Sequence, residues 1–199
     1  MDGGLYNSMA AYGVYGVDMF FVISGFVIPL SLFKMGFNYH MLVPFWISWF
    51  FRLYPAYALA SAIGVGLWFF STFLPGFRGA PPPPVTLEQI LANAGLLCDW
   101  MGQKWFLIVA WSLAIEAQYY LVIALICPLL FHRKKLIRIL VVSSWVLCPL
   151  FPSNLAVLLY WMALFGMGLS VMMFQQTLLP RWVLISVLIL CFGVQGVAR

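Results

Sequence analysis

Charged residues are scarce in this chain of 199 residues: they make up 8% of it, whereas an ordinary soluble domain carries about 25%. Hydrophobic residues make up 65% and aromatic residues 18%. So few charges cannot cover a surface that faces water, and this composition also excludes a disordered chain and a nucleic-acid-binding domain. We therefore expect a membrane protein that has the lipid bilayer as a partner and binds no nucleic acid.

The chain also lacks closely spaced cysteines and an early basic segment. Its four cysteines match neither a disulfide framework nor a metal-ligand pattern, so we expect packing roles for them and no bound metal; they are Cys98, Cys127, Cys148 and Cys191. The first fifteen residues contain no Lys or Arg, so we expect no secretory signal. The first hydrophobic segment should then stay in the membrane.

Long hydrophobic runs occupy most of the chain. A membrane span takes roughly 20 apolar residues, and six runs approach or exceed that length: 14–33, 54–74, 105–131, 139–154, 155–174 and 182–198. A tight turn at Pro149, Pro152, Ser153 and Asn154 is expected between the fourth run and the fifth. The sequence thus predicts an all-α fold, a polytopic membrane helical bundle with about six transmembrane helices, in which residues 1–199 form a single domain.

Basic residues predict how this bundle is oriented, because Lys and Arg are retained on the cytoplasmic side of short loops. If the cluster at 133–138 lies inside, alternation of the spans places seven basic residues inside: Lys34, Arg52, Arg133, Lys134, Lys135, Arg138 and Arg181. The other three then lie outside: Arg78, Lys104 and Arg199. We expect a multi-pass protein of the inner or plasma membrane with its N-terminus outside. A natural chain that starts outside without a signal is less common, which suggests that something upstream is missing.

The longest connection between runs, 75–104, is expected to be an external loop. The run from Pro81 to Pro84 favours polyproline II, and a short helix from Thr86 to Leu97 is expected after it, with Thr86 as N-cap. On the inner side, the aromatic-rich segment 40–52 suits the membrane–water interface just before the second run.

Two carboxylates lie inside the apolar runs, where a charged group costs about 2.5–3.5 kcal/mol near the bilayer centre. Glu116 lies about eleven residues into the third run, some 16 Å deep in a core of about 30 Å, and Asp18 lies roughly one turn into the first run. Both are candidate catalytic residues, because ionisable residues inside membrane spans are usually functional. The alternatives are a hydrogen-bond hub for helix packing at Glu116 and an interfacial group at Asp18.

Polar side chains surround Glu116 at helical spacing. Ser112 precedes it by four residues, and Tyr119 and Tyr120 follow it by three and four, so the side chains project together. Their hydroxyls can hydrogen-bond the carboxylate, and we predict that all three bind substrate. Taken by itself, Arg52 is expected to be a headgroup anchor.

Three segments, taken in order, resemble the acyltransferase 3 family of integral membrane acetyl- and acyltransferases that modify surface polysaccharides and related glycans. Residues 13–28, GVYGVDMFFVISGFVI, are similar to the family signature G-V-D-[LMI]-F-F-V-[LI]-S-G-F-[LV]-I. Residues 45–57, FWISWFFRLYPAY, are similar to its arginine-containing segment, and residues 111–121, WSLAIEAQYYL, to W-S-L-[SA]-[VI]-E-x-Q-[FY]-Y.

The resemblance implies transfer of an acyl group, usually acetyl, from acyl-CoA to a hydroxyl of a glycan or lipid-linked saccharide that is presented from outside. Acyl-CoA would be a co-substrate and no cofactor would stay bound. The resemblance also implies that Arg52 engages the donor phosphate, and we expect Asp18 and Glu116 to orient or polarise a catalytic base.

The family pattern is incomplete in this sequence. The family's first helix carries an Arg and, eleven positions later, a His regarded as the essential base, and no residue here matches either. Basic residues usual at the positions of Ser48 and Trp49 are also absent. We therefore expect a partial domain that lacks the first family helix and the C-terminal helices, with an inactive fragment as one outcome.

Two other functions remain open. In a transporter or flippase-like protein, Asp18 and Glu116 would bind protons or a cation; the third possibility is a non-catalytic membrane scaffold. We rank the transporter lower, because the sequence has no repeat of Gly- or Pro-broken helices in two related halves.

Overall fold

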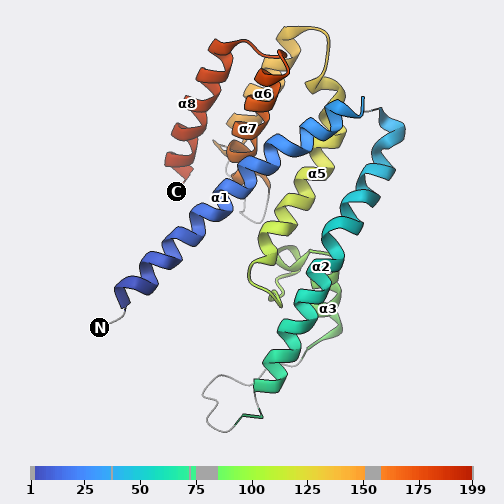
Figure 1. Cartoon of the computed structure of the whole chain (residues 1–199), viewed down its shortest axis with the longest axis vertical. Coiled ribbons are helices and arrows are strands. Elements are labelled where there is room, and N and C mark those ends of the chain that lie inside the picture. Colours follow the sequence, from blue (N-terminus) through green and yellow to red (C-terminus); the bar gives the residue numbers. More distant parts are fainter. Residues whose placement is uncertain (1–2, 37, 72, 75–84, 151–157, 199) are drawn as a thin grey trace. The chain divides into compact units, whose positions relative to one another are not determined.

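A computed structural model of the chain describes residues 3–36, 38–71, 73–74, 85–150 and 158–198. Every regular element within these ranges is helical, which confirms the predicted all-α fold (Figure 1). The elements are α1 (Gly3–Lys34), η1 (Tyr39–Met41), α2 (Leu42–Ser71), α3 (Leu87–Ala94), α4 (Cys98–Met101), α5 (Ala110–Leu130), α6 (Lys135–Leu147), η2 (Cys148–Leu150), α7 (Leu158–Gln175) and α8 (Arg181–Ala198). The proline run 81–84 and the predicted turn residues 152–154 lie outside the described residues.

Four helical segments within the described residues are long and apolar enough to cross a membrane, against about six predicted: Tyr15–Lys34, Tyr39–Ser71, Ala110–Leu130 and Leu158–Gln175. Helix α6, which overlaps the fourth apolar run, has 13 residues and is about 20 Å long, less than a hydrocarbon core of about 30 Å. Residues 151–154 of that run lie outside the described residues. In addition to these four segments, α8 has 18 residues, Arg181–Ala198, over the sixth predicted run, 182–198. The chain is thus a membrane protein with several candidate spans.

The second span begins earlier than the sequence predicted. The aromatic segment 40–52, expected to precede a span at 54–74, is largely part of α2 itself, which runs from Leu42 through Pro55 to Ser71. Pro44 lies in the first turn of α2, where a missing backbone N–H breaks no helical hydrogen bond. α2 is therefore about 45 Å long, more than the thickness of the hydrocarbon core.

The chain forms two compact units. The first consists of Met1–His40 together with Gln118–Arg199, and the second of Met41–Ala117. Helix α5 contributes residues to both units.

The first unit is built around α7, against which α1, α6 and α8 pack (Figure 1). Two glycines bring the backbones of α1 and α7 into contact: a Cβ atom added at Gly25 would meet the backbone of Phe165, and one added at Gly168 would meet the backbone of Val22 and Phe26. Small residues allow such close approach between helices in membranes. The ring of Phe21 on α1 packs against Trp161 and Phe165 on α7.

The second unit contains a short helix, α3, that lies beside α2 instead of beyond its end. The Tyr57 hydroxyl of α2 donates a hydrogen bond to the Asn93 carbonyl of α3, with an oxygen–oxygen distance of 3.0 Å. Tyr57 precedes Ser71, the last residue of α2, by fourteen positions, or about 21 Å. Part of the predicted external loop therefore folds back along α2.

The N-terminus of α3 agrees with the prediction from sequence. The Thr86 side chain accepts a hydrogen bond from the Gln89 backbone N–H at 3.2 Å, so Thr86 is the N-cap. The helix ends at Ala94, earlier than the expected Leu97, and Leu96 has a positive φ of 56°. This left-handed residue ends the helical path before α4.

Candidate functional site

Glu116 lies on α5 and is buried, with 4% of its surface exposed. The helix begins at Ala110, whereas the sequence predicted an apolar run from 105, so Glu116 lies six residues, or about 9 Å, from the helix start instead of some 16 Å into a span. A carboxylate enclosed in this way interacts strongly with any charge or dipole near it, because the surroundings have a low dielectric constant. Its catalytic role stays a prediction.

Two of the three hydroxyls predicted to bind Glu116 donate their hydrogen bonds elsewhere. The Ser112 hydroxyl donates to the Val109 carbonyl at 2.8 Å, across the first turn of α5. The Tyr119 hydroxyl donates to the Gly25 carbonyl at 3.4 Å. Neither hydroxyl therefore donates to the Glu116 carboxylate, and that part of the prediction is wrong.

Tyr119 is a packing residue of the first unit. It is fully buried, and its ring stacks on Phe165 with centroids 4.1 Å apart and meets Trp145 edge-on at 5.7 Å. Its hydroxyl reaches Gly25, one of the glycines at the crossing of α1 and α7. Tyr120 is also buried. The substrate-binding roles of Ser112, Tyr119 and Tyr120 stay predictions.

Asp18 lies on α1 in the first unit and is half-buried. The residue one turn later, Phe21, is fully buried, and its ring contacts Trp161 and Phe165 of α7 at centroid distances of 5.2 and 4.9 Å. Since residues three apart share a helix face, Asp18 belongs to the side of α1 that faces α7. Asp18 and Glu116 belong to different units, and their joint action on a base stays a prediction.

Arg52 lies on α2 in the second unit and is exposed. On the same helix, the rings of Phe50 and Tyr54 are stacked at 4.4 Å. An exposed guanidinium is accessible to a phosphate group, for which it is a strong charge-assisted donor. Its predicted contact with a donor phosphate stays a prediction.

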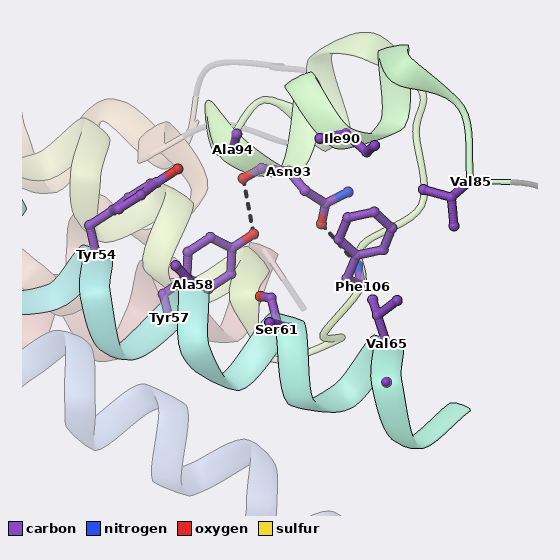
Figure 2. Close-up of a pocket in the computed structure, with 12 residues that line it drawn as sticks. Tyr54, Tyr57, Ala58, Ser61, Val65, Val85, Ile90, Asn93, Ala94 and Phe106 are labelled. Carbon is purple, nitrogen blue, oxygen red and sulfur yellow. Dashed lines mark hydrogen bonds between the residues drawn. The ribbon is translucent and has the colours of Figure 1, made fainter. Parts of the chain in front are cut away.

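The second unit contains a cavity of about 500 Å³ that the sequence did not predict (Figure 2). Its lining is mainly apolar and comes from α2, from α3 and from the segments on either side of α3; the lining residues are Tyr54, Tyr57, Ala58, Ser61, Ala62, Val65, Gly66, Val85, Ile90, Asn93, Ala94 and Phe106. The signal in the sequence was the series of small residues at helical spacing on α2, which leaves room beside that helix face.

Asn93 holds the far wall of this cavity in place. Its side-chain Nδ2 donates to the carbonyls of Gln89 at 2.9 Å and Lys104 at 3.1 Å, and its Oδ1 accepts from the Phe106 backbone N–H at 2.9 Å. Its backbone carbonyl accepts from Tyr57, as Figure 2 shows. The buried Asn93 thus joins α2, α3 and the segment before α5. In the sequence, only the amide side chains of Gln89 and Asn93 indicated such a hydrogen-bond network.

Cys98 lies close to this network. It is fully buried, its sulfur lies 4.0 Å from the Lys104 carbonyl, and burial raises the pKa of its thiol to about 11. A thiol that stays protonated at neutral pH is a poor nucleophile and a poor metal ligand. Among the described residues, no group of three or more His, Cys, Asp and Glu side chains is placed to hold a metal ion.

Comparison with known proteins identifies a family and a relative. A family model described as an acyltransferase domain, acyltransferase 3, matches residues 2–198. An uncharacterized protein of Haemophilus influenzae (strain ATCC 51907 / DSM 11121 / KW20 / Rd) is 28% identical over 144 residues, which cover 66% of this chain and 56% of the relative. The match thus spans little more than half of that relative's length. No solved structure matches the chain significantly.

Proposed function

Since the chain belongs to the acyltransferase 3 family, we propose that it transfers an acyl group, in particular acetyl, from acyl-CoA to a hydroxyl of a glycan or lipid-linked saccharide at the inner or plasma membrane. The family match over residues 2–198 carries the proposal. The four apolar helices support it, because they allow one protein to meet a donor on one side of a membrane and an acceptor on the other.

The reaction joins the acceptor oxygen to the acyl carbon. The hydroxyl oxygen attacks the thioester carbonyl, the carbon–sulfur bond breaks, and the coenzyme A thiol leaves with the proton that a base has taken from the hydroxyl. We assign Glu116 and Asp18 to orienting or polarising that base. The burial of Glu116 supports this role, since a carboxylate shielded from water stabilises a nearby positive charge more strongly.

The donor and acceptor are held by the other predicted residues. Arg52 contacts a phosphate of acyl-CoA, for which its exposed position on α2 is suitable. Ser112, Tyr119 and Tyr120 are assigned to substrate binding. The hydroxyls of Ser112 and Tyr119 act there as hydrogen-bond acceptors, because their protons are donated to backbone carbonyls.

A transfer assay with labelled donor tests the proposal. Membrane vesicles from cells with and without the gene are supplied with acetyl-CoA that carries a radioactive acetyl group, and free coenzyme A thiol and labelled saccharide are measured. We expect both products in equal amounts and only when the gene is present. Equal labelling in both membranes contradicts the proposal, and proton-coupled solute uptake without release of coenzyme A would identify a transporter instead.

A further inference from the structure

The cavity beside α2 is a feature of the second unit that the proposed reaction does not use. Its volume of about 500 Å³ lies within the range of ligand-binding pockets, which is about 300–1,000 Å³. None of its lining residues is charged. A ligand that fits such a lining is apolar and uncharged in the part that lies inside the cavity.

Two polar side chains of the cavity, Tyr57 and Asn93, are hydrogen-bonded within the protein, whereas the buried Ser61 hydroxyl has no hydrogen-bond partner among the described residues. The hydroxyl proton of Tyr57 is donated to Asn93, and both donor hydrogens and the side-chain oxygen of Asn93 are used in hydrogen bonds to the backbone. A saccharide ring needs several partners for its hydroxyls, since each polar group buried without a hydrogen bond costs about 1–3 kcal/mol. A hydrocarbon chain needs none.

The length of the cavity fits one leaflet of a bilayer. Its lining on α2 extends from Tyr54 to Gly66, which is twelve residues or about 18 Å along the helix. One leaflet contributes about half of a hydrocarbon core of about 30 Å, and a lipid chain in it extends over a similar distance. The cavity lies within the candidate span Tyr39–Ser71.

The surface next to the cavity is suited to contact with lipid. Large apolar side chains of α2 are exposed within this stretch and just after it: Leu59, Ile63, Leu67 and Phe70. Phospholipid chains would surround this surface in a membrane. A chain can therefore enter the cavity without crossing a polar barrier formed by α2.

We propose that this cavity is a binding site for one acyl chain of a bilayer phospholipid. The chain lies along α2 against the small side chains of Ala58, Ala62 and Gly66, and it is covered by Ile90 and Phe106. The site is independent of the proposed transfer reaction, so its test measures lipid and not activity.

A substitution that fills the cavity tests the proposal. Among the described residues, no atom lies within 4 Å of a Cβ added at Gly66 or at Gly193, an exposed glycine of α8. Gly66→Leu therefore adds a side chain in the cavity without a backbone clash, and Gly193→Leu adds the same side chain elsewhere. Ala62→Phe is a second filling variant.

Phospholipid bound to each purified protein in mild detergent is counted by native mass spectrometry and identified after extraction. We expect about one phospholipid per wild-type and Gly193→Leu chain, and about a tenfold weaker affinity, equivalent to about 1.4 kcal/mol, for both filling variants. Equal phospholipid content in all four proteins overturns the proposal. A polyprenyl lipid that is bound to the wild type and lost from the filling variants overturns the assignment to phospholipid.

Discussion

The helices α7 and α2 differ in how much of each is buried inside the protein. The buried share of the candidate span is 61% on α7 but only 6% on α2. In the first unit, α7 is surrounded by three helices and touches α1 backbone to backbone. In the second unit, α2 is joined to the short helix α3 by a hydrogen bond from the Tyr57 side chain and has a cavity beside it.

This difference separates two ways of building a membrane protein. Close helix packing gives the first unit its stability, because lipid tails are as apolar as the side chains and burial alone does not hold helices together in a bilayer. The second unit is held together by a few hydrogen bonds instead of close helix packing. This arrangement leaves space for a ligand. The following predictions test whether the two units depend on these different contacts.

The largest effect is expected for Gly168→Ala in the first unit. The added Cβ would meet the backbone of Val22 and Phe26 on α1, and backbone atoms cannot move aside as a flexible side chain can. We expect a loss of about 3 kcal/mol in unfolding free energy, measured as a lower midpoint of thermal unfolding in mild detergent. Gly193→Ala, at an open position of α8, is the control and should leave the midpoint unchanged or slightly higher. Equal midpoints for the two variants would refute close packing at Gly168.

A smaller and more local effect is expected for Asn93→Ala in the second unit. The substitution leaves the N–H of Phe106 without its side-chain acceptor and removes one donor to the carbonyls of Gln89 and Lys104, at a cost of about 1–3 kcal/mol. The Lys104 carbonyl keeps its hydrogen bond from the Gln89 side chain at 3.1 Å. Hydrogen exchange of backbone amides should accelerate between residues 89 and 106 and stay unchanged in α7. Gln103→Ala is the control, since the Gln103 side chain makes no hydrogen bond within the described residues. Faster exchange in α7 as well would mean that the hydrogen bonds of Asn93 also stabilise the first unit, which contradicts the proposed difference between the units.

Tyr57→Phe should have a weaker effect at the same place. It removes one hydroxyl that donates to the Asn93 carbonyl, a hydrogen bond worth about 1 kcal/mol, and keeps the aromatic ring. We expect a modest acceleration of exchange in α3. Tyr54→Phe, on the same face of α2, removes a hydroxyl with no hydrogen bond in the described part of the chain and should have no effect. If the backbone amides of α3 exchange at equal rates in the two variants, the Tyr57 hydrogen bond does not stabilise α3.

The smallest perturbation is a change of pH at Cys98. Burial raises the pKa of this thiol to about 11, from an ordinary value of 9.0, so the protonated form is favoured in the folded protein. Alkylation by iodoacetamide, followed by peptide mass spectrometry, should be slow at pH 8 and should increase about tenfold per pH unit until pH 11, because only the thiolate reacts. A rate that levels off near pH 9 would show that Cys98 is not enclosed.

The features that were predicted correctly from the sequence depend on local interactions. The apolar runs predicted helices, and Thr86 followed by an apolar segment predicted the N-cap of α3, because a cap is a contact between residues three apart. The fold-back of α3 and the cavity depend on the contact between Tyr57 and Asn93, which are 36 residues apart. Hydropathy carries no information about such a pair.

The hydrogen bonds around Glu116 were mispredicted for a similar reason. The apolar run suggested a helix from 105, whereas α5 begins at Ala110, so Ser112 lies in the first turn, where its hydroxyl reaches the Val109 carbonyl. Tyr119 is drawn to Gly25, a residue 94 positions earlier in the chain. Helical spacing predicted correctly that these residues share α5, but their partners were decided by the helix boundary and by tertiary packing.

Replacement of Glu116 by Gln in the chromosomal gene tests the proposed acyl transfer most directly. The substitution keeps the size of the side chain and removes its charge, and Glu88→Gln on the exposed face of α3 is the matched control. We predict that the acyl content of the cell's saccharides falls by about 100-fold or more for Glu116→Gln and stays at the wild-type level for Glu88→Gln, with equal amounts of both proteins in the membrane. Wild-type acylation in cells that carry Glu116→Gln would contradict the proposed role of Glu116.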